Sequence, residues 1–118
     1  MQLVTILRPY NALILRAGIA FSFLWFGWSG VSNTNMWVGL VPTWTAAIAT
    51  PETLVFLHGI FEIVFGFLLL TGIWTGPVAL ILLLNLLHTI TLLSFGPVMV
   101  RDITIALALL SVALAPRA

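Results

Sequence analysis

Two pairs of polar residues have types and spacings that could support chemistry. His58 and Glu62 lie four residues apart, and Asn85 and His88 lie three apart. Either spacing places both members of a pair on one face of an α-helix. Both pairs occur within long apolar stretches, where ionisable side chains are costly and tend to mark functional sites. Such groups could hydrogen-bond the polar head of a hydrophobic molecule, or the two histidines could bind a metal ion or haem.

The segments that carry these residues have the composition of membrane-spanning helices. Of 118 residues, 62% are hydrophobic and 6% are charged, whereas a soluble domain has about 25% charged residues. Because so few charged side chains cannot cover the surface of a water-soluble protein of this size, we expect most of the surface to face lipid. The sequence has no basic cluster, which argues against a nucleic-acid partner. It has no cysteine, which excludes thiol catalysis, disulfides and iron–sulfur ligation by this chain.

Turn-forming and helix-breaking residues divide the apolar sequence into four stretches. The expected transmembrane helices cover about residues 10–31, 52–71, 77–95 and 99–115. Each is close to the ~20 residues that cross ~30 Å of hydrocarbon. They lack the alternating pattern of membrane β-strands. The sequence therefore predicts an all-α membrane protein, a four-transmembrane-helix antiparallel bundle forming a single domain over residues 1–118.

The segment between the first two predicted helices is too short for a domain and unusually apolar for a loop. It contains Trp37, Pro42 and Trp44, and tryptophan favours the headgroup level of a membrane. We therefore expect an interfacial Trp/Pro loop that covers one end of the bundle. The pattern is equally compatible with an ordinary anchoring loop and with a functional lid.

The arginines give the expected orientation. Four crossings place both termini on one side of the membrane, where Arg8 and Arg117 flank the bundle and Arg16 lies nearby. The positive-inside rule then predicts that both termini are cytoplasmic. The expected location is a prokaryotic plasma membrane.

The two polar pairs are expected at matching depths. The second and third helices run antiparallel, so His58 and His88 each lie roughly 9 Å from the membrane side that holds the Trp/Pro loop. Glu62 and Asn85 lie deeper, roughly 14–15 Å from that side. Matching depth on adjacent helices predicts that these side chains face each other inside the bundle.

Residues from the other two helices could complete a site at that depth. Arg101 and Asp102 enter the fourth helix from the same side, and Trp25 lies at a similar depth on the first helix. Either Arg101 or Arg16 could neutralise Glu62, and Arg101 is favoured. The candidate ligand-binding residues are thus His58, Glu62, Asn85, His88, Arg101 and Trp25, with Arg16 and Asp102 as candidate charge partners.

Several short motifs are similar to those of a known family. The first helix contains Arg16-Ala17-Gly18 and later Phe26-Gly27. The loop reads V-P-T-W, and the second helix follows the pattern P-E-x-x-V…G-x-x-E-x-x-x-G-x-x-L-L between residues 51 and 70. In their order and spacing these motifs resemble the DoxX-like family of small four-helix membrane proteins, over most of the chain.

The resemblance implies a link to redox chemistry in membranes. The family name comes from a subunit of a thiosulfate:quinone oxidoreductase. By resemblance, Glu62 occupies the family's intramembrane glutamate position and Arg16 its first-helix arginine. His58 is a departure, because family members often carry a small residue there.

Three hypotheses about function remain open. The leading one is a subunit of a redox-linked membrane complex, not catalytic alone, that binds a quinone-like hydrophobic ligand at the His/Glu/Asn cluster. The alternative is a purely structural accessory subunit that packs against larger membrane partners or self-associates. The third is a carrier of haem or a metal ion held by His58 and His88. No hydrolase, nucleotide-binding or zinc-protease motif is present in the sequence.

Overall fold

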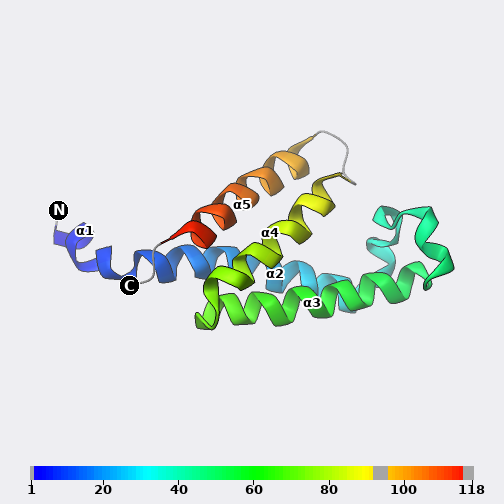
Figure 1. The fold of residues 1–118 in the computed structure, drawn as a ribbon, viewed down its shortest axis with the longest axis horizontal. Coiled ribbons are helices and arrows are strands. Elements are labelled where there is room, and N and C mark those ends of the chain that lie inside the picture. Colours follow the sequence, from blue (N-terminus) through cyan, green and yellow to red (C-terminus); the bar gives the residue numbers. More distant parts are fainter. Residues whose placement is uncertain (1, 92–95, 116–118) are drawn as a thin grey trace.

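Helices dominate the structure, a computed structural model that describes residues 2–91 and 96–115 (Figure 1). A short helix is followed by four long ones: α1 Gln2–Leu7, α2 Asn11–Ser32, α3 Pro51–Thr71, α4 Thr75–Thr91 and α5 Pro97–Leu114. Short 3-10 helices connect them: η1 Arg8–Tyr10, η2 Thr34–Met36, η3 Val38–Leu40 and η4 Thr43–Ala47. The all-α fold with four long helices confirms the fold class predicted from the sequence.

Some helix ends differ from the expected ones. Helix α1 was not expected, since the first predicted helix begins at about residue 10. α4 begins at Thr75 and α5 at Pro97, each two residues before the predicted start. A proline is tolerated in the first turn, where the missing N–H would have no intrahelical partner. The predicted end of the third helix at residue 95, and Arg117, lie outside the described residues.

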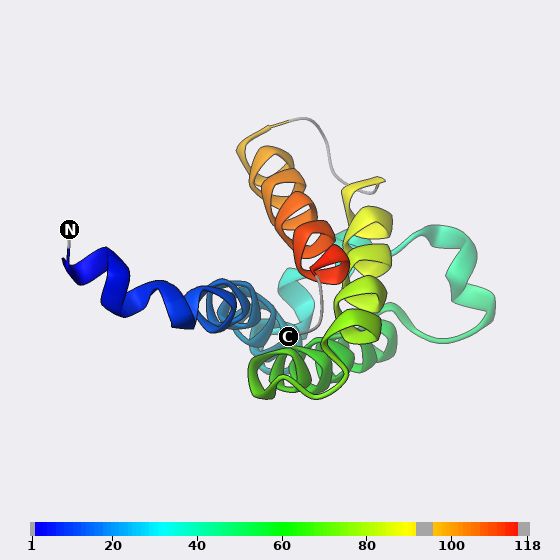
Figure 2. The same cartoon turned by 60° about the vertical axis from the view of Figure 1, so that its left-hand side comes forward.

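The lengths of the helices suit a membrane. Within the described part of the chain, three helical runs are long and apolar enough to span one: the continuous run of 31 residues from Gln2 to Ser32, then α3 with 21 residues and α5 with 18. α4 is equally apolar but has 17 described residues. The run from Gln2 to Ser32 is longer than the ~20 residues a bilayer requires, and α1 projects beyond the bundle (Figure 2).

The four long helices form two antiparallel pairs, α2 with α3 and α4 with α5. The α4–α5 pair leans across the α2–α3 pair (Figures 1 and 2). The two pairs come together near the turn from α3 to α4 and diverge toward the segment that follows α2. A core of buried apolar side chains joins the pairs, including Phe23, Leu69, Leu82 and Leu109.

Glycines bring α2 and α3 into direct backbone contact. A Cβ atom on Gly59 would lie 2.7 Å from the backbone oxygen of Gly27, and a Cβ on Gly27 would lie 2.7 Å from the oxygen of Gly59. No other residue fits at either position without moving the backbone. Small residues at such a crossing are typical of helix packing in membranes, where close van der Waals contact replaces the hydrophobic effect as the driving force.

Local signals fix both ends of α3, the helix that carries His58 and Glu62. At its start, Thr50 is the N-cap and its side chain accepts a hydrogen bond from the Thr53 backbone N–H at 3.3 Å. Pro51 follows at the first helical position, where its fixed φ angle is favourable. At its end, Gly72 has φ +83° and its N–H bonds to the oxygen of Leu68. This left-handed residue ends the helix and sends the chain back as α4.

Candidate functional site

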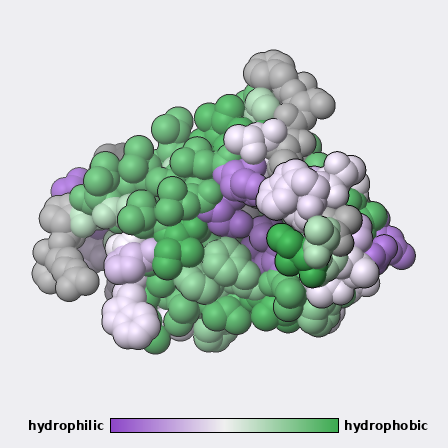
Figure 3. Space-filling model, turned by 45° about the vertical axis from the view of Figure 1, so that its right-hand side comes forward, coloured by the Kyte–Doolittle hydropathy of each residue, from purple (hydrophilic) through white to green (hydrophobic). Residues whose placement is uncertain are grey.

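A cavity of about 300 Å³ lies between the two helix pairs, at the end where they diverge. All four long helices and the segment after α2 contribute to its walls. Figure 3 shows hydrophilic side chains gathered in a recess bordered by hydrophobic ones. Apolar and aromatic side chains form most of the lining, among them Phe23, Phe26, Trp37, Leu40, Leu86 and Ile105. Such a space suits a small apolar molecule with a few polar groups.

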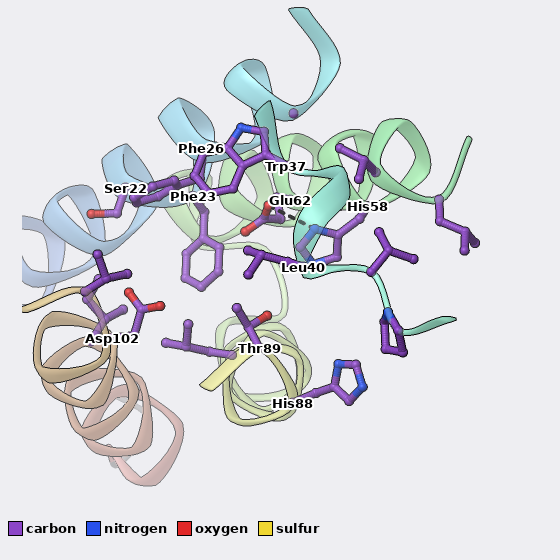
Figure 4. A pocket seen from close by; sticks show the side chains of 18 of the residues that line it. Ser22, Phe23, Phe26, Trp37, Leu40, His58, Glu62, His88, Thr89 and Asp102 are labelled. Atoms are coloured by element: carbon purple, nitrogen blue, oxygen red, sulfur yellow. Dashed lines mark ion pairs between the residues drawn. The ribbon is translucent and has the colours of Figure 1, made fainter. Parts of the chain in front are cut away.

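Glu62, His58 and Asn85 form a chain of polar contacts that links α3 to α4. The Nδ1 atom of His58 lies 3.3 Å from the Oε1 atom of Glu62, one helical turn away. Its Nε2 atom lies 2.8 Å from the Oδ1 atom of Asn85. The Glu62 side chain is 12% exposed and that of His58 43%. Figure 4 shows the His58 ring and the Glu62 carboxylate facing each other at the cavity wall.

His58 is in contact on both sides of its ring: its Nε2 atom lies against the Asn85 amide and its Nδ1 atom against Glu62. Which partner of the first contact donates depends on the histidine tautomer. The other carboxylate oxygen of Glu62, Oε2, has no hydrogen-bond partner among the described residues, and Glu62 lines the cavity. A carboxyl group can accept a hydrogen bond from a ligand when it is ionised and can also donate one when it is protonated.

A second polar pair lies on α5. Asp102 is buried, and its Oδ1 atom accepts hydrogen bonds from Arg101 Nε at 3.2 Å and Arg101 Nη2 at 3.1 Å. The Arg101 guanidinium also lies over the Phe26 ring of α2, 4.5 Å from its centroid, a favourable cation–π arrangement. Both residues line the cavity. Polar groups therefore reach the cavity from α3 and from α5.

The candidate charge partners of Glu62 are placed differently from the expectation. Arg101 pairs with Asp102, its neighbour in sequence. Arg16 lies at the other end of the bundle, where its Nη1 atom donates to Thr75 Oγ1 at 3.3 Å. Neither arginine is paired with Glu62 in the described residues, and His58 takes that place because i,i+4 spacing brings the two side chains together.

Two residues predicted to bind the ligand, Trp25 and Asn85, do not line the cavity. Trp25 is 55% exposed and does not line the cavity; its neighbour Phe26 does, since α2 turns by about 100° per residue. Asn85 also lies outside the cavity lining and contacts His58 instead. Trp25 therefore faces outward, and Asn85 positions the histidine rather than reaching the cavity itself.

His88 lines the cavity but stands apart from the Glu62–His58–Asn85 chain (Figure 4). Its side chain is exposed and makes no hydrogen bond to the described residues. Both ring nitrogens of His58 are already engaged. A pair of histidine ligands would need a free nitrogen from each ring, so this geometry does not support the two-histidine haem or metal hypothesis.

The segment after α2 supplies cavity residues that were not singled out from the sequence. Trp37 Nε1 donates to Ser29 Oγ at 2.9 Å, and the Trp37 ring packs edge-on against Phe26 with centroids 5.7 Å apart. These contacts hold Leu40 and Pro42 over the cavity. Phe26 was expected to line the apolar part of the site, and Phe23 could have been found from it, because i,i+3 spacing places both on one face of α2.

Fold and site together define a class: a four-helix integral membrane protein with a cavity between its two helix pairs. The model of the family described as DoxX matches residues 11–95 of the sequence, which cover α2, the following segment, α3 and the described part of α4. The chain belongs to the DoxX family, as its motifs indicated. Comparisons with curated proteins and with solved structures give no match.

Proposed function

We propose that this DoxX-family protein binds a quinone-like hydrophobic molecule in the cavity between its helix pairs and serves a redox-linked membrane complex. It is not catalytic alone in this proposal. The observation that carries it is the cavity itself: a largely apolar and aromatic space of about 300 Å³ with Glu62, Arg101 and Asp102 in its walls. The link of the family name to a thiosulfate:quinone oxidoreductase subunit adds support.

The position of the cavity along α3 favours a ligand that arrives from the membrane. Glu62 lies near the middle of α3, a helix of 21 residues, and therefore roughly 15 Å from either end. A water-soluble substrate would have to cross half the hydrocarbon layer to reach it. A lipid-soluble molecule already occupies that depth, and its flat head would contact Phe23, Phe26 and Trp37.

The first test is to identify what the protein carries. Gently purified protein would be examined by native mass spectrometry and by extraction of bound lipids, together with an absorption spectrum. A quinone bound at near-stoichiometric amounts is the expected result. Bulk phospholipid alone would favour the alternative, a purely structural accessory subunit.

A pair of matched variants ties the ligand to the cavity. Ile105 lines the cavity, whereas Ile103, on the same helix, is 40% exposed on the outside. Ile105→Trp fills the space, so bound quinone should fall at least tenfold. Ile103→Trp should leave it unchanged. Equal retention in both variants would place the ligand elsewhere and reject the proposed site.

Orientation and location belong to the same proposal: both termini in the cytoplasm of a prokaryotic cell. Since the sequence has no cysteine, single cysteines can be introduced at Gln2 and at Asn35 without background. A membrane-impermeant thiol reagent added to whole cells should label Asn35→Cys and spare Gln2→Cys. The opposite pattern would reverse the proposed orientation.

A further inference from the structure

The chain before α2 extends past the rest of the bundle. Arg16 of α2 packs beside Gly72, the residue that ends α3, so the residues before Arg16 lie beyond the end of α3. α2 alone has 22 residues, about 33 Å, which already exceeds the ~30 Å of hydrocarbon that a helix must cross. α1 and η1 are therefore not needed to span the membrane. On a straight course they would carry their side chains roughly 15 Å further, into water.

The chain changes direction between α1 and α2. Pro9 lies within η1 and lacks the backbone N–H that would continue an α-helical hydrogen-bond pattern. Tyr10, the last residue of η1, has φ −95° and ψ 7°, outside the α-helical region. Figure 2 shows α1 turned away from the axis of α2. α1 is thus set at an angle to a membrane-spanning helix, as a helix that lies on the membrane surface has to be.

Residues 2–10 have an amphipathic pattern. Their large apolar side chains follow the i, i+3, i+4, i+7 spacing of one helical face: Leu3, Ile6, Leu7 and Tyr10. The polar side chains recur every three residues on the opposite face: Gln2, Thr5 and Arg8. The apolar face is exposed throughout, and α1 has no buried residue. An exposed apolar face opposite a polar one is typical of a helix that lies in the plane of a membrane interface.

The charges at this end favour an anionic surface. Arg8 in η1 and Arg16 in α2 are the basic residues described here, and neither forms an ion pair within the described part of the chain. The three acidic residues of the sequence, Glu52, Glu62 and Asp102, lie at the start of α3 or in the cavity walls, toward the other end. Anionic phospholipid headgroups attract basic side chains near the membrane surface.

We propose that residues 2–10 form an interfacial helix that lies on anionic phospholipid, in the leaflet beside the turn from α3 to α4. Its apolar face enters about 5–10 Å into the boundary between headgroups and acyl chains, and Arg8 keeps its charged end among the headgroups. Trp74 in the turn is exposed and is of the type that favours the same level. The contact continues the lipid-facing surface of the bundle, so its partner is the bilayer that surrounds α2.

The test measures the depth of individual side chains in the full-length protein. Since the sequence has no cysteine, single nitroxide labels can be attached at residues 2, 3, 5 and 6 in nanodiscs of mixed phosphatidylcholine and phosphatidylglycerol. Collisions with oxygen, which partitions into lipid, and with a water-soluble nickel chelate report the depth of each label. Labels at Leu3 and Ile6 should collide mainly with oxygen. Those at Gln2 and Thr5 should collide mainly with the nickel chelate.

Three other patterns would overturn the proposal. Access of the nickel chelate to all four labels would show that the helix lies in water. Access of oxygen alone to all four would show that these residues enter the hydrocarbon as part of a longer span. Exclusion of both reagents at Leu3 and Ile6 would show that protein covers the apolar face, either a second copy of the chain or another subunit.

Matched variants test the apolar face. With the label at Leu3, Ile6→Gln should raise access of the nickel chelate severalfold, because it places a polar group on the face that enters the membrane. Thr5→Gln makes a polar substitution on the opposite face and should leave the access unchanged. Both positions are exposed, so neither change removes a buried contact of the bundle. Equal access in the two variants would overturn the assignment of this face to lipid.

A third variant tests the charge. Arg8→Gln should shift the balance from surface-bound to released helix roughly fivefold in nanodiscs that contain phosphatidylglycerol, the effect of one basic residue at an anionic surface. In nanodiscs of phosphatidylcholine alone the same variant should behave like the unchanged protein. An equal shift in both lipids would overturn the assignment of anionic lipid as the partner.

Discussion

At the turn from α3 to α4 the two helix pairs are locked together, whereas at the opposite end they part around the cavity. At the turn, Gly72 leaves space for Arg16, and Arg16 donates to Thr75. At the cavity end, the carboxylates of Glu62 and Asp102 belong to different pairs and each is held by a neighbour within its own pair. Polar side chains bridge the two pairs at both ends, through Arg16 and Thr75 at the turn and through His58 and Asn85 beside the cavity. The comparison teaches that only at the cavity end do carboxylates line a space between the pairs.

The contact between α2 and α3 underlies both ends, and breaking it should have the largest effect. Gly59→Leu forces side-chain atoms into the Gly27 backbone, where a Cβ alone would be 2.7 Å from an oxygen. We expect a loss of about 3 kcal/mol in unfolding free energy, the upper part of the range for overpacking. The change in unfolding free energy can be measured by SDS-induced unfolding in mixed micelles. Gly18→Leu, on an α2 glycine with no neighbour within 4 Å, should change stability by less than about 0.5 kcal/mol. A similar small change for Gly59→Leu would mean that the helices are not in contact there.

Substitution at the turn from α3 to α4 should have the next largest effect on the unfolding free energy. Gly72 has φ +83°, and a Cβ there would lie 2.5 Å from Arg16 Nη1. Gly72→Ala should therefore cost about 2 kcal/mol, from the left-handed conformation and the displaced arginine together. Gly76→Ala, four residues later and with open space around it, is the matched control in the same unfolding assay. Equal stability of the two variants would show that the turn does not depend on glycine at residue 72 or on its contact with Arg16.

At the cavity end, Trp37→Phe removes one hydrogen bond from the segment that covers the cavity. Ser29 is buried, so its hydroxyl loses the indole N–H at 2.9 Å without replacement. We expect a loss of about 1 kcal/mol and faster hydrogen exchange at Leu40 and Val41. Trp44→Phe provides the control, since Trp44 is 70% exposed in the same segment. Identical hydrogen-exchange rates at Leu40 and Val41 in both variants would show that the Trp37–Ser29 hydrogen bond does not hold this segment in place.

The smallest expected effect concerns the bond between His58 and Asn85. Hydrogen bonds between membrane helices average about 0.6 kcal/mol, so a double-mutant cycle is needed. Leucine at each position singly and together should give a coupling energy of about that size. The parallel cycle of His88 with Asn85 should give zero. Zero coupling for His58 would show that Asn85 does not hold the histidine.

Helix type and approximate position could be predicted because composition and chain breakers are strong signals in a membrane protein. Counting residues along the helices matched His58 with His88 and Glu62 with Asn85, but the structure joins His58 to Asn85 and leaves His88 apart. Rotation about each helix axis is harder to predict. When nearly all side chains are apolar, no polar face fixes which side turns inward, and Trp25 was assigned to the cavity although Phe26 occupies that face.

The ion pairs could not be predicted for a different reason. Charge alone makes any arginine a plausible partner for Glu62, but the choice depends on which helices converge. Arg16 lies where α3 turns into α4, and Arg101 reaches the adjacent Asp102 first. The role of Trp37 was equally hidden, because its hydrogen bond to Ser29 depends on how the segment after α2 folds back.

The turn between α3 and α4 has a mechanical consequence. α4 extends 17 residues from it, about 25 Å, so a tilt of about 5° at the turn moves its far end by about 2 Å. We expect the α4–α5 pair to tilt as a rigid body relative to the α2–α3 pair, with the hinge near Arg16. Tilting is one way in which a helix accommodates a change in bilayer thickness. Distances between spin labels at Leu57 and Leu87 should therefore change with acyl-chain length, and constant distances would show a rigid frame. A small adjustment of the surrounding lipid would then widen or narrow the space beside Glu62 with no change of rotamer.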